Sequence, residues 1–289
     1  MTIKERGYTH WEGELKEGKF PWLPITKWGI KLTFKKRFFK LLFFLSLVPA
    51  LIFLTGIYIS ERLEDFRFMI RDSTDFIKIN PNYFKAYFTN DLLLFIIVMI
   101  LVFCGAGLIS DDLKYNSLQL YFSRPLRKKD YFLGKVSVIV FFLFIITLIP
   151  GLILFVMKLV FSGSFAFFVS YPWLPLSIIG CSVFVTGFFS FYTLFLSSLS
   201  KNRRYVSIFI FGLYIFSDIL FGIFYGIFRS PYFALLSIKS NLQQVGMTLF
   251  NQKAPYDFPW LYSLSVLLLF CILSAAVLRK RVRGVEIIK

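Results

Sequence analysis

The apolar positions of this chain are gathered in long blocks rather than along one face of a helix. From Leu159 to Ser200 the sequence has 42 residues without Asp, Glu, Lys, Arg or His. Further charge-free stretches of 19–22 residues lie at Leu41–Ser60, Leu92–Ser110, Val136–Met157 and Phe258–Leu278. A hydrocarbon core about 30 Å thick needs roughly 20 apolar residues in a helix. Because soluble helices keep a polar face, these blocks predict an integral membrane protein.

We expect an all-α fold with six membrane spans. The longest apolar block exceeds one ordinary span, and Gly163, Pro172 and Pro175 divide it into a brief loop and a fourth span. Asp218 alone interrupts the fifth. The predicted spans are Phe38–Ser60 (kinked at Pro49), Asp91–Ser110, Leu133–Met157, Trp173–Leu199, Tyr205–Phe228 and Phe258–Leu278.

The basic residues predict the orientation of these spans. An even number of spans places both termini on one side, which receives 24 Lys and Arg residues against 9 on the other. Lys and Arg accumulate in cytoplasmic loops. We therefore expect a multi-pass inner-membrane protein with both ends cytoplasmic. Its parts are a cytoplasmic N-terminus (1–37), the six-span domain (38–279) and a basic tail (280–289).

Composition agrees with the membrane assignment. Hydrophobic residues make up 57% of the chain and the mean hydropathy is +0.70. In a soluble protein the net charge of +17 would suggest nucleic acid, but here the charge follows the membrane topology, so no nucleic-acid partner is expected. The three cysteines, Cys104, Cys181 and Cys271, lie far apart in apolar runs and suit buried thiols.

The segment before the first span suits a helix in the headgroup region. Residues 1–20 lack the apolar core of a signal peptide. From Pro24 onward, Ile25, Trp28 and Leu32 lie near one helical face with lysines beside them. Such a helix would bind the lipid bilayer. The alternative is a basic flank of the first span. The expected anchors are Trp22, Trp28, Lys31 and Lys35.

Two connections on the outer side differ in character. Residues 61–90 form a polar loop of mixed charge with some helix. Residues 229–257 are too polar to span and too apolar to extend freely into water, with apolar residues at helical spacing. We expect a short helix pair or re-entrant element at the surface before the last span.

Known catalytic patterns are missing. The sequence has no GxxxxGK[ST] phosphate loop, and His10 is its only histidine. A histidine metal cluster is thereby excluded, and a histidine-based triad is not expected. We expect that this chain is not itself an enzyme and that it binds neither a metal ion nor a cofactor.

The connection between spans two and three predicts a short helix outside the membrane. Asp111 and Asp112 open it, and Arg124 and Pro125 close it. Leu118, Tyr121 and Phe122 follow at i, i+3 and i+4 and give it an apolar face. An exposed apolar face of this kind marks a docking site for protein or lipid. The alternative is an interfacial helix without a partner.

This connection resembles the signature of type-2 ABC exporter permeases. In that family an acidic residue leads into a Gly-Thr-Leu-Glu-like coupling helix, followed by Ser-x-Pro, a basic pair and Gly-Lys. Asp112, Ser117-Leu118, Ser123-Arg124-Pro125 and Gly134-Lys135 match. Asn116 replaces the usual Gly and Gln119 the usual Glu, which puts any ion pair of that Glu in doubt. The NosY/NatB-like branch is nearest.

The resemblance implies a division of labour. Two copies of a separate ABC ATPase would hold ATP and Mg, and a homodimer of this chain would convert ATP hydrolysis into export. A non-transporting subunit that acts on a periplasmic or extracellular protein is the alternative. The implied ATPase-coupling residues are Asp112, Asn116, Leu118, Gln119, Tyr121, Phe122 and Arg124.

The predicted spans contain two further groups of candidate functional residues. Asp218 is either a gating or pathway carboxylate or a structural group bonded to hydroxyls such as Tyr214 or Ser217. Gly222 and Gly226 form a GxxxG motif that lets helices approach closely, and we expect a homodimer contact there. Gly105 is a second candidate contact.

Overall fold

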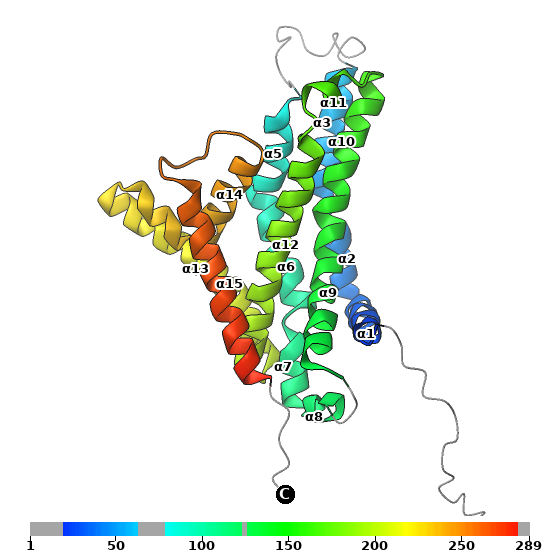
Figure 1. Ribbon diagram of the computed structural model, residues 1–289, viewed down its shortest axis with the longest axis vertical. Coiled ribbons are helices and arrows are strands. Elements are labelled where there is room, and N and C mark those ends of the chain that lie inside the picture. Colours follow the sequence, from blue (N-terminus) through cyan, green and yellow to red (C-terminus); the bar gives the residue numbers. More distant parts are fainter. Residues whose placement is uncertain (1–19, 63–78, 123–125, 283–289) are drawn as a thin grey trace, which may run out of the picture.

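The computed structural model describes residues 20–62, 79–122 and 126–282, and every regular element in these ranges is helical (Figure 1). Six helical segments in the described ranges are long and apolar enough to cross a membrane, which confirms the predicted six-span class. In chain order the elements are α1 (Trp22–Phe34), α2 (Arg37–Leu45), α3 (Val48–Glu61), α5 (Pro81–Thr89), α6 (Asp91–Cys104), α7 (Gly107–Lys114), α8 (Ser117–Phe122), α9 (Lys128–Ile146), α10 (Leu148–Ser162), α11 (Ala166–Ser170), α12 (Leu174–Leu199), α13 (Arg203–Phe228), η1 (Pro231–Leu236), α14 (Ile238–Leu249) and α15 (Trp260–Arg281).

The first three spans are each built from more than one helix. In the first, α2 passes to α3 just before Pro49, and in the third, α9 passes to α10 at Thr147. In the second, Asn90 separates α5 from α6, and its side chain accepts the N–H of Leu92 at 2.8 Å. Because lipid offers no hydrogen bonds, such interruptions persist only where protein groups satisfy the backbone.

The second and third spans are longer than predicted. They extend over Pro81–Lys114 and Lys128–Ser162. Lys158, which the sequence placed in a loop, lies inside α10 and pairs with Glu61 at the end of α3. The helix ends where Gly163 adopts a left-handed φ of 61°, a conformation that glycine adopts without strain. The loop expected before the fourth span contains the short helix α11.

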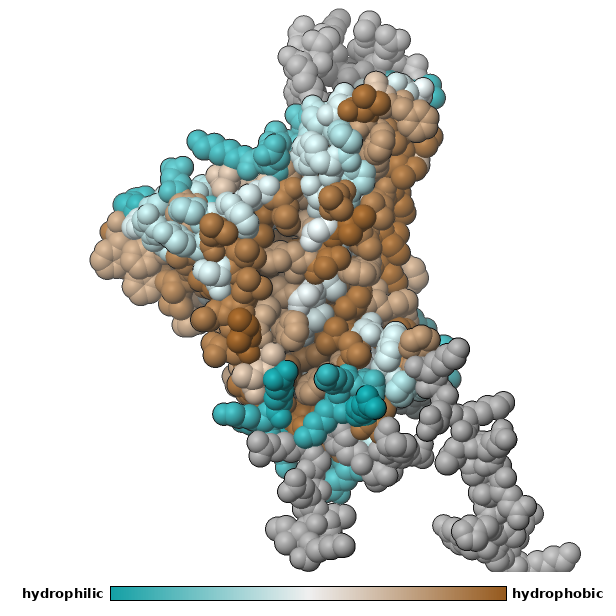
Figure 2. All heavy atoms as spheres, in the orientation of Figure 1, coloured by the Kyte–Doolittle hydropathy of each residue, from teal (hydrophilic) through white to brown (hydrophobic). Residues whose placement is uncertain are grey.

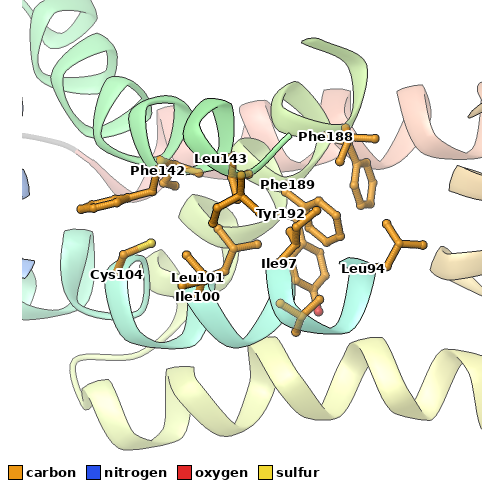
Figure 3. Packing of buried hydrophobic residues seen from close by; sticks show 14 of the residues in the cluster. Leu94, Ile97, Ile100, Leu101, Cys104, Phe142, Leu143, Phe188, Phe189 and Tyr192 are labelled. Carbon is orange, nitrogen blue, oxygen red and sulfur yellow. The ribbon is translucent and has the colours of Figure 1, made fainter. Parts of the chain in front are cut away.

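The core lies where α6, α9 and α12 meet. Leu94, Ile97 and Leu101 of α6 pack toward Phe189 and Tyr192 of α12, with Phe142 and Leu143 of α9 beside them (Figure 3). Tyr192 also donates its hydroxyl hydrogen to the carbonyl of Ile210 at 2.7 Å, which ties α12 to α13. These central helices form the frame on which the remaining elements are held.

The outward faces of α3, α13 and α15 leave large apolar side chains exposed, among them Leu51, Ile219 and Leu269. Figure 2 shows the resulting apolar band, with hydrophilic residues gathered toward the two ends. We name these ends by their helices: α1, α8 and the last turn of α15 lie toward the α8 end, and α11 lies at the α11 end (Figure 1).

The connection between α13 and α15 folds back along α13. The ring of Phe233 in η1 stacks on Phe224 and Phe228 of α13, with centroids 5.3 Å apart in each pair. The chain then returns to the level of Asp218 before α14 begins. Phe228 lies ten residues beyond Asp218 on α13, so this return covers about 15 Å. The predicted helical element before the sixth span is thus confirmed, and it dips along the bundle.

Candidate functional site

The second span breaks close to the α8 end. Helix α6 ends at Cys104 and α7 begins at Gly107. The carbonyl of Phe103, beside the break, accepts hydrogen bonds from Lys36 Nζ and Arg203 Nη2, each at 3.0 Å. Two cations from opposite sides of the bundle therefore converge on one backbone oxygen.

Ser197 of α12 completes the polar partners of this break. Its hydroxyl donates to the carbonyl of Ala106 at 2.9 Å and accepts the N–H groups of Ile109 and Ser110 at 3.0 and 3.1 Å. One side chain thus uses its donor and both acceptor positions on the freed backbone. These hydrogen bonds fix α7 to α12, the fourth span.

Asp112 is the centre of an ion-pair network between spans two and three. Its Oδ2 lies 2.6 Å from Lys135 Nζ and accepts the hydroxyl hydrogen of Tyr131 at 2.7 Å. Tyr131 and Lys135 are one turn apart on α9 and both are buried. The Tyr121 ring of α8 lies 5.8 Å from Lys135 Nζ and 5.4 Å from the Tyr131 ring. The network therefore joins α7, α8 and α9.

Burial and the neighbouring Asp112 carboxylate act on the phenol of Tyr121 in the same direction. Desolvation raises the pKa of its phenol, and the nearby Asp112 carboxylate raises it further. The phenol therefore stays neutral, so its ring serves as a packing surface for Lys135.

Asn116 forms the corner between α7 and α8. Its φ is 53°, in the left-handed region that glycine and asparagine favour. The resemblance places Gly at this position in related proteins. Asn116 is thus a replacement that preserves the turn, and the corner is compatible with either residue.

The face of α8 that the sequence predicted to be exposed is turned toward the protein. Leu118 is only 7% exposed, and Tyr121 is half-buried against α9. The exposed residues described at this corner and on α8 are Tyr115, which is 69% exposed, Asn116 and Gln119. The prediction of an exposed apolar face at Leu118 and Tyr121 was therefore wrong. The side chain of Phe122 and the whole of Arg124 lie outside the described residues.

A cavity of about 300 Å³ opens beside this network. Its walls come from α1, α7, α8 and α9, with one residue each from the ends of α6 and α13 and from the α1–α2 corner. Three cations and two carboxylates line it: Lys36, Lys135, Arg203, Asp111 and Asp112.

The charges in the cavity are unevenly paired. Lys135 has its partner in Asp112, whereas Arg203 reaches Asp111 only at 4.0 Å. Among the described residues, no carboxylate lies within ion-pairing distance of Lys36. Burial, and then the like charge of Arg203, lower the pKa of Lys36 to about 8, although the Asp111 carboxylate opposes the shift.

Helix α1 crosses α9 in close contact. The Thr26 hydroxyl donates to the carbonyl of Gly134 at 3.1 Å. A Cβ on Gly134 would meet Ile25 at 2.8 Å, and one on Gly29 would meet Val138 at 2.6 Å, so both glycines are needed for this approach.

The predicted anchors lie mostly on the other side of α1. Trp28 is 54% exposed, with Lys31 Nζ 5.8 Å from its ring, and Lys35 is exposed. Trp22 is half-buried at the start of the helix. The arrangement suits a helix with one face on the protein and the other toward lipid headgroups.

Asp218 is paired, but not with the predicted hydroxyl groups. Lys239 Nζ of α14 lies 3.0 Å from its carboxylate, and Ser237 donates a hydrogen bond at 2.9 Å. Ser217 instead donates to the carbonyl of Tyr214 and accepts the N–H of Ile238. The sequence missed Lys239 because the spacing that predicts a helical element before the sixth span does not show which of its side chains returns to Asp218.

The same lysine reaches a second carboxylate. Asp91 lies 3.5 Å from Lys239 Nζ and accepts a hydrogen bond from Gln243 at 2.8 Å. The two carboxylates outweigh the effect of burial and raise the pKa of Lys239. Lys239 thereby links α6, α13 and α14 at one point.

The glycines predicted at a dimer contact differ in their surroundings. A Cβ on Gly222 or Gly226 would meet nothing within 4 Å, so this face of α13 is open in the single chain. A Cβ on Gly105 would meet Thr193 of α12 at 2.2 Å. Gly105 therefore serves packing within the subunit, and its expected place at a subunit contact was wrong.

Comparisons with known proteins identify the family. Residues 57–280 match the family described as ABC-2 family transporter protein. The match covers most of the chain, and the chain therefore belongs to that family. A comparison with curated proteins gave no match. Family membership makes the chain a permease component of an ABC transporter and implies an ABC ATPase partner.

Proposed function

We propose that this ABC-2 family protein receives mechanical force from a separate ATPase at the α8 end and converts it into export across the inner membrane. The observation that carries the proposal is the attachment of α8. The exposed residues Tyr115, Asn116 and Gln119 lie at or beside the start of α8, whereas Tyr121 on its inner face packs against the network around Asp112.

The attachment suits force transmission because α8 is connected to two spans at once. It follows α7 directly at the Asn116 corner, and Tyr121 packs on Tyr131 of α9. A push on the exposed surface would move the ends of spans two and three together. Removing one partner of such a buried ion pair costs roughly 3–5 kcal/mol because the other charge is left buried and unpaired, so the junction depends on both residues.

In this proposal the α8 end faces the cytoplasm, as the distribution of basic residues favours. ATP and Mg belong to the partner ATPase, two copies of which would bind a homodimer of this chain. The open face of α13 around Gly222 and Gly226 supports a contact between the two copies. We also propose that the chain falls in the NosY/NatB-like branch of the family.

A second function, force transmission without solute transport, is favoured by the surroundings of Asp218. Its charge is paired with Lys239, so it does not stand free on a translocation path. A complex of this kind would act on a protein at the outer face through the connection before Pro81, of which residues 63–78 lie outside the described part of the chain, and through 229–257. If a cargo is moved, a hydrophobic or lipid-like molecule suits the apolar spans better than a small ion.

The proposal is tested by co-purification with the ABC ATPase encoded beside the gene. We expect the full-length protein to capture this ATPase, and the Tyr115→Glu/Gln119→Arg variant to lose most of the capture. Lys253→Glu, which reverses an exposed charge between α14 and α15, is the control and should not change capture. Equal capture by all three proteins would contradict the proposed docking surface.

A further inference from the structure

We propose that the cavity beside Asp112 binds the phosphate of an anionic phospholipid, with Lys36 and Arg203 as its ligands. The inference rests on the proposed function only in assigning the cavity to the cytoplasmic leaflet. Its foundation is the convergence of two cations on one carbonyl oxygen of Phe103.

The charges that line the cavity do not balance. The cavity contains three cations and two carboxylates, so it carries one unmatched positive charge. One neutral carbonyl cannot neutralise two cations that lie side by side, and Asp111 is at the limit of pairing with Arg203. Burial, and then the like charge of Arg203, lower the pKa of Lys36. An anion placed between the two donors would remove the repulsion.

The two cations of the cavity lie at the ends of membrane spans. Lys36 directly precedes the first span and Arg203 begins the fifth. Both therefore lie at the depth where phospholipid headgroups meet the apolar core. Basic pockets between membrane helices at this depth bind anionic headgroups.

The lining of the cavity changes from polar to apolar. The polar floor is continuous with an apolar wall of Ile25, Trp28, Leu32 and Leu108. Trp28 and Leu32 are partly exposed, so this wall extends from the cavity to the lipid-facing side of α1. A molecule with a charged head and an apolar tail matches this gradient, whereas a free anion would use only the floor. The volume of about 300 Å³ accommodates a headgroup but not the acyl chains.

The experiment is native mass spectrometry of the full-length protein in detergent, with phosphatidylglycerol or zwitterionic phosphatidylcholine added. We expect one phosphatidylglycerol per chain to be retained in preference to phosphatidylcholine. Lys36→Gln/Arg203→Gln should reduce the retained phosphatidylglycerol at least tenfold. The matched control Lys27→Gln/Lys40→Gln removes two exposed lysines near the same end and should leave it unchanged.

A second variant guards against loss of folding, since Lys36 and Arg203 also hold the helix break. Leu32→Trp fills the apolar wall and leaves both donors in place, and it too should lower retention, whereas Leu41→Trp on the exposed face of α2 should not. Equal loss in the matched controls, or equal retention of phosphatidylcholine, would overturn the proposal. Displacement of the lipid by inorganic phosphate at equal concentration would assign the site to the free anion instead. Neither result depends on ATPase capture, so the two proposals fail separately.

Discussion

Lys135 Nζ lies 2.6 Å from Asp112 Oδ2, and this pair joins the end of the second span to the start of the third beside Tyr121 of α8. Lys135 is only 8% exposed, so its charge depends on Asp112 for compensation. The pair therefore supports the position of the surface on which the ATPase is proposed to act.

Removing the Asp112 charge should destabilise the protein. Asp112→Asn leaves a nearly buried ammonium without its partner, and we expect a loss of about 3 kcal/mol. The loss would appear as a lower midpoint of thermal unfolding in detergent. Asp111→Asn is the control, because its pair with Arg203 is long and partly exposed. Additive effects of Asp112→Asn and Lys135→Met in a double-mutant cycle would contradict a direct interaction.

The corner at Asn116 should accept glycine but not a β-branched residue. With φ at 53°, Asn116→Gly keeps the turn, whereas Asn116→Val strains it by roughly 1–2 kcal/mol. We expect Asn116→Val to lower both the unfolding midpoint and ATPase capture, and Asn116→Gly to preserve both. A valine variant with unchanged capture would show that the orientation of α8 is unimportant.

Sequence reasoning located this region, but it assigned the wrong face of α8. Charge-free blocks are long enough to identify spans because lipid imposes the same requirement on every residue of a span. Which face of a six-residue helix is buried depends on the elements packed around it, and no local pattern reports that. The partners Lys239 and Arg203 were missed for the same reason, since each is distant in sequence from the group that it pairs with.

The ion pair between Asp218 and Lys239 should stabilise the fold and take no direct part in transport. Asp218→Asn and Lys239→Gln should each lower the unfolding midpoint, and the double variant should lose less than the sum of the two effects. Transport or ATPase stimulation measured per folded protein should then change little. A complete loss of activity in Asp218→Asn at unchanged stability would instead assign this carboxylate to the transport path.

Binding of phosphatidylglycerol should weaken above pH 8. The pKa of Lys36 is lowered to about 8, so in the empty cavity its ammonium is present below this pH and is lost above it. The groups that face Lys36 are Arg203, Asp111 and Cys104, and Asp112, Tyr121 and Lys135 line the same cavity. If binding requires the ammonium, raising the pH from 7 to 9 should lower the affinity by up to about tenfold.

Lys36→Arg is the control for this pH dependence, because a guanidinium keeps its charge throughout the range. Its lipid affinity should be nearly constant between pH 7 and 9, as measured by native mass spectrometry. The same decline in Lys36→Arg as in the unaltered protein would trace the pH dependence to a different group.

Cross-linking between α8 and the co-expressed ATPase tests the proposed docking of α8 most directly. Cys104 and Cys181 are buried, and Cys271→Ser removes the half-buried third thiol, so a single introduced cysteine can carry a cross-linker. We predict that Gln119→Cys forms a cross-link to the ATPase and that Leu249→Cys, exposed at the end of α14, does not. Cross-linking at Leu249→Cys but not at Gln119→Cys would contradict the proposed docking.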